Sequence, residues 1–112
     1  MRIEETMLFP VFDNAKSFYN KATVKKYYNN NNILVKSELY SYNSLVVTIE
    51  NNSYKLNYNI KEKLLFSCTT LRHIKDFLKQ NYWQLKIEIN SKKDIIKYEG
   101  CNYYRDIKKE KF

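Results

Sequence analysis

Three side chains in the segment SCTTLRHIKDFLKQN, residues 67–81, belong to the types used in nucleophilic catalysis. Cys68 offers a thiol, His73 is the only imidazole of the chain, and Asp76 offers a carboxylate. Such catalysis needs a base within hydrogen-bonding reach of the nucleophile and a third group that orients the base. On a helix, His73 and Asp76 would share one side and satisfy each other locally. We therefore expect no catalytic residue and no enzymatic activity.

The cysteines and the histidine are too few for a metal centre. Cys68 and Cys101 are the only cysteines, they do not form a CxxC pair, and His73 is the only histidine. A structural zinc site needs four ligands, and nitrogen and sulfur atoms from these residues fall short of that. We expect neither a metal nor a cofactor, and we expect both thiols to be reduced.

The same segment carries a row of cations. Arg72, Lys75 and Lys79 recur three and four residues apart, so on a helix they would form one face suited to phosphates. The formal net charge is +8 and the pI is about 9.4. A basic surface of this kind attracts phosphate backbones and acidic proteins. No second helix with a turn precedes the segment, so the helix-turn-helix pattern is missing.

Aromatic side chains supply a second kind of binding group, because Tyr, Trp and Arg dominate protein interfaces. The chain contains 11 tyrosines. The residues that we expect to contact a partner are Arg72, Lys75, Lys79, Tyr27, Tyr28, Trp83, Tyr103, Tyr104 and Arg105. Tyrosines on an exposed sheet would alternatively stack single-stranded bases. The candidates for that alternative are Tyr40, Tyr42, Tyr54 and Tyr58.

These side chains must be positioned by strands over the first half of the chain. Apolar and polar residues alternate with period two over 22–60, which predicts an antiparallel meander of three or four strands. Asparagines interrupt the alternation at 29–32, at Asn43-Ser44 and at 51–52, and asparagine tolerates the left-handed conformation of turns. The clearest predicted strand covers 54–60.

A helix over 69–81 follows. Leu71, Ile74, Phe77 and Leu78 recur at helical spacing and form one apolar stripe. Thr69 or Thr70 can cap the start, and Asn81 suits the left-handed end.

Beyond the helix, residues 82–90 (YWQLKIEIN) alternate again and predict a further half-buried strand. Ser91 then caps a short helix that ends at Gly100. We treat 1–112 as a single domain, with 1–12 and 101–112 as candidate flexible ends.

The predicted fold class is α+β: a small antiparallel sheet of four to five strands, with one amphipathic helix packed on one face. The predicted core consists of Val24, Leu39, Leu45, Val47, Ile49, Leu56, Ile60, Leu71, Ile74, Phe77, Leu78, Leu85 and Ile87. The N-terminus lacks the basic-then-apolar order of a signal peptide, and no stretch approaches the ~18 apolar residues that cross a bilayer. We expect a cytoplasmic protein without membrane contact.

Three motifs carry a resemblance to a known group of proteins. They are KSFYNKA (16–22), LYSYNSLVV (39–47) and TTLRHIKDFLKQN (69–81). In this order they resemble a family of small uncharacterised proteins of phages, plasmids and integrated elements in Firmicutes and related bacteria. The chain departs from the family pattern at Asn20 and Tyr82, where that family has glycine.

The resemblance implies provenance, an accessory gene of a mobile element. Small accessory proteins of phages often inhibit host defence machinery, including CRISPR effectors, by binding a protein surface or by competing for its nucleic-acid site. The expected function is therefore non-enzymatic: stoichiometric binding of a host protein or ribonucleoprotein defence complex in the bacterial cytoplasm, in the manner of an anti-CRISPR protein. The alternative is a basic nucleic-acid-binding accessory or regulatory protein.

Overall fold

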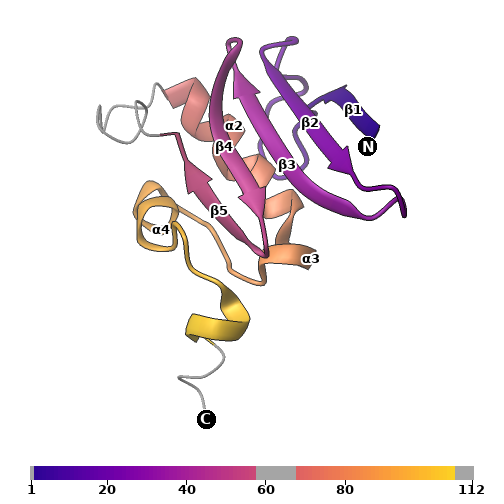
Figure 1. Cartoon of the computed structure of the whole chain (residues 1–112). Coiled ribbons are helices and arrows are strands. Elements are labelled where there is room, and N and C mark those ends of the chain that lie inside the picture. The colour runs from indigo at the N-terminus through magenta and orange to yellow at the C-terminus, as the bar shows by residue number, and fades with distance from the viewer. Residues whose placement is uncertain (1, 58–67, 108–112) are drawn as a thin grey trace.

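The chain forms a five-stranded sheet in which every pair of neighbours is antiparallel (Figure 1). The computed structural model describes residues 2–57 and 68–107. The strands, which lie in the sheet in chain order, are β1 (Arg2–Met7), β2 (Ala22–Tyr28), β3 (Leu34–Ser41), β4 (Ser44–Glu50) and β5 (Ser53–Leu56). The helices are α2 (Cys68–Gln80), α3 (Tyr82–Leu85), α4 (Lys92–Lys97) and a π-helical turn (Tyr103–Ile107). The predicted α+β class is confirmed.

Asparagine makes the tight turns, as the sequence predicts. The link between β4 and β5 is Asn51-Asn52, and both residues have positive φ (56° and 64°). The link between β3 and β4 is Tyr42-Asn43, also with positive φ, so this turn comes one residue earlier than predicted. Two consecutive left-handed residues match the right-handed twist of the flanking strands.

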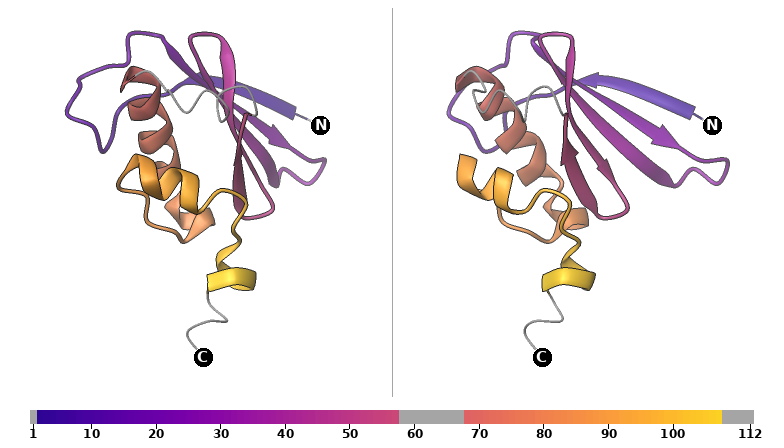
Figure 2. Two further views of the ribbon diagram at one scale, coloured as in Figure 1. Left: turned by 90° about the vertical axis from the view of Figure 1, so that its left-hand side faces the viewer. Right: turned by 60° about the vertical axis from the view of Figure 1, so that its left-hand side comes forward.

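Helix α2 covers one face of the sheet, with α4 beside it (Figure 2). The stripe Ile74, Phe77 and Leu78 is buried against the inner face of the strands. Of the predicted core residues, those that are buried are Val24, Leu39, Val47, Ile49, Leu56, Ile74, Phe77, Leu78, Leu85 and Ile87. Leu45 and Leu71 are only half-buried, and Ile60 lies outside the described residues.

A register shift explains the error at Leu45. The pairing of β3 with β4 passes from Leu39↔Val47 to Tyr40↔Leu45, so Val46 is an extra residue in β4. The irregularity lets Val46 and Val47 both be buried, while Leu45 lies opposite the half-buried Tyr40. Strict alternation cannot anticipate such a bulge.

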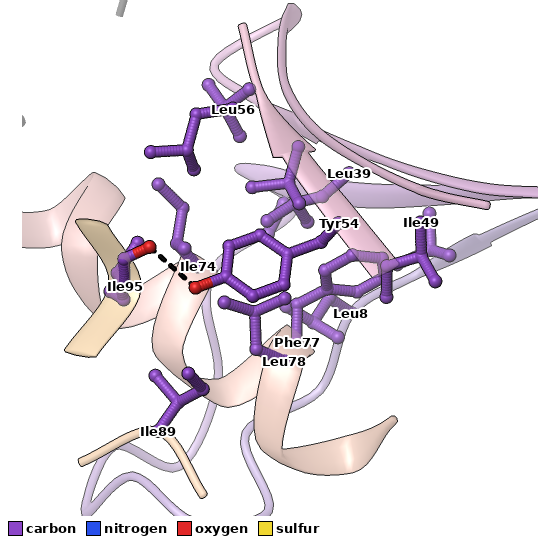
Figure 3. Packing of buried hydrophobic residues seen from close by; sticks show 14 of the residues in the cluster. Leu8, Leu39, Ile49, Tyr54, Leu56, Ile74, Phe77, Leu78, Ile89 and Ile95 are labelled. Atoms are coloured by element: carbon purple, nitrogen blue, oxygen red, sulfur yellow. Dashed lines mark hydrogen bonds between the residues drawn. The ribbon is translucent and has the colours of Figure 1, made fainter. Parts of the chain in front are cut away.

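Tyr54 joins the sheet to α4. Its ring lies in the middle of the core and its hydroxyl donates to the Ile95 carbonyl at 2.5 Å (Figure 3). Burial raises the pKa of this hydroxyl. Tyr54 is therefore a core residue and not a stacking platform, which corrects its place among the candidates for nucleic-acid binding; Tyr58 lies outside the described residues.

The strand predicted over 82–90 is wrong. Residues 82–85 form α3, and the chain continues to Asn90 without regular structure after Lys86, which has a left-handed φ of 59°. The buried residues of this segment are nevertheless Leu85, Ile87 and Ile89. The alternating pattern therefore indicates which residues contact the core, although they do not form a strand. The edge of β5 is occupied by residues 99 and 100, which hydrogen-bond to that strand.

Both segments treated above as candidate flexible ends contain regular structure. Residues 2–7, within the segment 1–12, pair with β2 as strand β1. The short helix predicted after Ser91 is confirmed: Ser91 Oγ accepts from the Asp94 N–H, and Gly100 follows with φ of 77°. Within 101–112, residues 103–107 form the π-helical turn.

Replacing Tyr54 by Phe removes the hydroxyl and leaves the Ile95 carbonyl without its donor. We expect the free energy of unfolding to fall by about 1–2 kcal/mol in urea denaturation. Tyr19→Phe is the matched control, because that side chain is exposed, and it should change stability by less than about 0.5 kcal/mol. Equal stability of Tyr54→Phe and the parent would mean that this bond does not fasten α4.

Candidate functional site

A buried carboxylate fixes the loop that follows β1. Asp76 of α2 is 1% exposed and accepts three backbone N–H groups, from Val11 at 3.1 Å, Phe12 at 3.1 Å and Asp13 at 3.0 Å. Gln80, one turn further along α2, donates to the same carboxylate at 2.7 Å and to the Phe9 carbonyl at 2.8 Å. The loop is thus held through its backbone, and its side chains are left to point elsewhere.

His73 has a different partner from the one that the sequence suggested. Its Nδ1 lies 2.9 Å from Ser41 Oγ of β3, and Ser41 Oγ lies 3.2 Å from Thr70 Oγ1. The ring is fully buried and meets Phe18 edge-on at 4.6 Å. The expected local pairing of His73 with Asp76 is therefore wrong: the histidine joins α2 to the sheet, and Asp76 does not orient it.

The anchored loop displays apolar side chains to solvent. Phe9, Val11 and Phe12 are 59%, 64% and 55% exposed. Tyr82 and Trp83 of α3 are also exposed. We call these five residues the aromatic patch.

Two hollows connect the loop with α3. One, of about 340 Å³, is lined by Phe12 and Tyr82 among others. The second, of about 200 Å³, is lined by Phe9, Val11 and Trp83, and it reaches the inner side of β1 and β2. Each hollow is lined by residues of the loop and of α3, so the patch is indented and its side chains are not isolated from one another.

Three lysines border the aromatic patch, together with Glu88, which lines the first hollow. Lys79 Nζ lies 5.5 Å from the centre of the Phe12 ring and donates to Asn90 Oδ1 at 3.0 Å. Lys86 Nζ lies 6.0 Å from the centre of the Tyr82 ring, and Lys26 lines the second hollow. Such contacts between a cation and a ring are attractive and leave the ammonium group at the rim. The patch can thus offer apolar anchors together with positive charge.

Of the cations predicted on α2, Lys79 alone borders the patch through these contacts. Arg72 forms a two-pronged ion pair with Asp13, through Nε at 2.9 Å and through Nη2. This pair holds the pKa of the Asp13 carboxyl below its ordinary value. The charge of Lys75 acts in the same direction. Arg72 is therefore engaged in fixing the end of the anchored loop.

The predicted tyrosines of β2 lie away from the patch. Tyr27 is on the face of the sheet opposite the buried Val24, and its hydroxyl donates to Glu38 at 2.5 Å, which raises its pKa to about 12. Lys36 Nζ lies 4.4 Å from the centre of the Tyr27 ring, and Arg2 lies 4.4 Å from the centre of the Tyr28 ring. Both cations lie closer to these rings than Lys79 and Lys86 lie to the rings of Phe12 and Tyr82.

The predicted C-terminal residues come closer. Tyr103 and Tyr104 meet edge-to-face at 5.4 Å and share a hollow of about 500 Å³ with Tyr82 and Lys86. Arg105 binds Asp106 and the Gly100 carbonyl. The structure therefore brings Lys79, Trp83, Tyr103 and Tyr104 toward one side of the molecule, and leaves Tyr27 and Tyr28 on the sheet.

Sequence reasoning missed Phe9, Val11, Phe12 and Tyr82. The signal in the sequence is the apolar run MLFPVF, residues 7–12, which contains the only proline of the chain. Such an apolar run is also typical of a buried strand. The sequence does not show that Asp76 binds the backbone of this run and leaves its side chains in solvent.

Comparison with known proteins places the chain in a family. Residues 6–97 match DUF8033, which is described as a family of unknown function. The chain belongs to the DUF8033 family. The range matched to DUF8033 contains the aromatic patch and Asp76, whereas Tyr103, Tyr104 and Arg105 lie beyond its end. No curated protein and no solved structure matches the chain. Among the helices that the structure describes, none has the length and apolar character needed to span a membrane.

Asp76→Ala tests the anchoring of the loop. Removing the carboxylate leaves the N–H groups of Val11, Phe12 and Asp13 without their acceptor, so we expect the free energy of unfolding to fall by about 3 kcal/mol. Amide hydrogen exchange should speed up at those three residues. Lys75→Ala, on the same helix, should alter stability by less than about 0.5 kcal/mol. Unchanged exchange in Asp76→Ala would show that the loop is held by other contacts.

His73 makes stability depend on pH. Burial, and then the charge of Arg72, lower its pKa from the ordinary 6.5. As the pH falls below 6.5, His73 takes up a proton in the unfolded chain but stays neutral in the folded chain until its lowered pKa is reached. The free energy of unfolding therefore decreases in this range, by up to about 1.4 kcal/mol per pH unit. Urea denaturation between pH 7.5 and 5.5 should show this slope, and His73→Gln should flatten it. If the parent and His73→Gln lose stability equally as the pH falls, the pH dependence comes from a titratable group other than His73.

Proposed function

We propose that this DUF8033 protein is a non-enzymatic binding protein that docks another protein on the aromatic patch. The observation that supports this is the exposure of Phe9, Val11 and Phe12 on a loop whose backbone is bound to a buried carboxylate. Folding normally buries such side chains, because exposing apolar surface costs free energy. A loop that is fixed and yet displays them is suited to contact with a partner.

The rigidity of the loop matters for affinity. A partner that binds a mobile loop must also order it, which weakens the complex, whereas a loop that is already ordered avoids that cost. Trp83 and Tyr82 add the residue types that contribute most at protein interfaces. We therefore expect a few side chains, Phe12 and Trp83 foremost, to supply most of the binding free energy.

The charge of the chain bears on the class of partner. The net charge of +8 and the lysines at the rim favour an acidic protein and would speed encounter with it. The resemblance to accessory proteins of mobile elements points to a host defence complex in the bacterial cytoplasm, which the protein would inhibit by stoichiometric binding, as anti-CRISPR proteins do.

Nucleic-acid binding is the alternative that the basic charge favours. Against it, ring faces on the sheet carry cations: Lys36 on Tyr27, Lys25 on Tyr40 at 4.9 Å and Lys21 on Tyr42 at 5.2 Å. Bases would have to displace these contacts in order to stack. Binding to phosphates would also weaken steeply as salt is raised, which separates the two alternatives in an experiment.

The double variant Phe12→Ser/Trp83→Ala tests the patch. Tagged protein is used to capture partners from a bacterial lysate, with and without nuclease, at low and moderate salt. We expect a captured protein that survives both treatments with the parent chain, and at least a tenfold loss with the variant, the size of one binding hot spot.

Ile33→Ser is the matched control, since Ile33 is 57% exposed at the turn between β2 and β3 and lines neither hollow of the aromatic patch, and it should leave capture unchanged. Recovery that disappears with nuclease would make the protein a nucleic-acid binder. Equal capture by the parent and the double variant would remove the aromatic patch from the proposal.

A further inference from the structure

The two edge strands of the sheet, β1 and β5, differ in how their outward backbone groups are hydrogen-bonded. At β5 the Tyr54 carbonyl accepts the Gly100 N–H at 2.8 Å, and the Leu56 N–H donates to the Glu99 carboxylate at 2.7 Å. Asn102 also donates from its side chain to the Asn51 carbonyl at 3.0 Å. The segment after α4 therefore closes this edge and satisfies backbone groups that would otherwise face outward.

At β1 the backbone groups alternate between the sheet and the outside. The Leu8 N–H donates to the Ala22 carbonyl at 2.9 Å, next to the pair Met7↔Thr23. In an antiparallel ladder every second residue bonds the same neighbour. Arg2, Glu4 and Thr6 thus bond β2, and the N–H and C=O groups of the other three residues, Ile3, Glu5 and Met7, point away from the sheet.

Within the described part of the chain, no hydrogen bond reaches the outward backbone groups of β1. All six residues of β1 are exposed, and Figure 2 shows the strand at the margin of the sheet, away from α2 and α4. A row of alternating donors and acceptors at this spacing is complementary to an extended backbone.

A second copy of this chain is a poor occupant. Antiparallel self-pairing must place outward residues opposite outward residues, so the two positions in a pair add up to an even number. The two registers that overlap over five of the residues 2–7 place Glu4 opposite Glu4, or Glu5 opposite Glu5. Like charges directly opposite each other destabilise a ladder. On the β2 side these carboxylates lie opposite Lys26 and Lys25. On the open side of β1 they oppose dimerisation and favour a strand that carries bases.

We propose that β1 receives an extended, basic segment of the otherwise acidic protein partner as a sixth strand, with Lys or Arg opposite Glu4 and Glu5. This rests on the proposed function, in that the partner is a protein. The added strand would lie beside the hollow that Thr6, Leu8 and Lys26 line together with Val11 and Trp83. Side chains on the α2 side of that strand would enter the hollow, so backbone pairing and the aromatic patch form one binding surface.

Glu5→Pro tests the backbone pairing. Proline removes the outward N–H of residue 5 and leaves the bonds of Glu4 and Thr6 to β2, and an edge strand tolerates it at such a position. Glu5→Gln is the matched control, because it keeps the N–H. The probe is a nonapeptide selected from a random displayed library on the full-length chain, then synthesised and titrated by calorimetry.

We expect the selected peptide to alternate and to contain Lys or Arg. Its affinity should fall at least tenfold for Glu5→Pro and only a few-fold for Glu5→Gln. The second measurement uses the unaltered chain and two N-methylated peptides, one methylated at the odd positions and one at the even positions. Methylation of the N–H groups that face β1 should abolish binding, and methylation of the other set should leave binding unchanged. This arm remains decisive even if Glu5→Pro perturbs the fold.

Strand addition is overturned if the library yields no binder, if both N-methylated peptides bind like their parent, or if Glu5→Pro binds as tightly as Glu5→Gln. In those cases a loss of partner capture by Phe12→Ser/Trp83→Ala would still support docking on the aromatic patch. The opposite result is also informative. If the double variant captures the partner as well as the parent does, and the peptide still needs the Glu5 N–H, strand addition at β1 is supported and docking on the aromatic patch is rejected.

Discussion

The carboxylate of Asp76 is the contact on which the exposed surface of this protein depends. A buried carboxylate needs donors to offset the loss of water, and here they come from the backbone of Val11, Phe12 and Asp13. The same bonds turn the loop so that its backbone faces α2. The apolar side chains then have no place in the core and stand in solvent, although residues of this kind are usually buried.

Other buried polar groups fasten the layers to one another. His73 and Thr70 meet Ser41 between α2 and β3, and the hydroxyl of Tyr54 meets the Ile95 carbonyl between β5 and α4. Each bond joins segments far apart in the chain, so each needs the finished fold in order to form. Apolar burial supplies the drive toward a compact structure, and these bonds select one arrangement of α2 and α4 on the sheet.

The exposed features lie close together in space. The open edge of β1, the loop 9–13 and the hollow beside Trp83 follow one another in space, and Lys26 and Lys79 border them. The opposite edge, at β5, is closed by Glu99 and Gly100. The chain therefore covers the β5 edge of its sheet and leaves the β1 edge available to another strand. This places the proposed binding surface at the β1 edge.

Local pattern in the sequence determined the meander from β2 to β5, helix α2 with its buried stripe, the asparagine turns, and the short helix after Ser91, because periodicity and turn chemistry act over a few residues. It did not determine that residues 82–90 lack a strand, since a strand exists only where a neighbouring backbone is free to pair. The binding surface was decided by tertiary structure for the same kind of reason. Trp83 and Lys79 were recognised by residue type, but Phe9, Val11 and Phe12 became a surface only because Asp76, more than 60 residues away in the chain, binds their backbone.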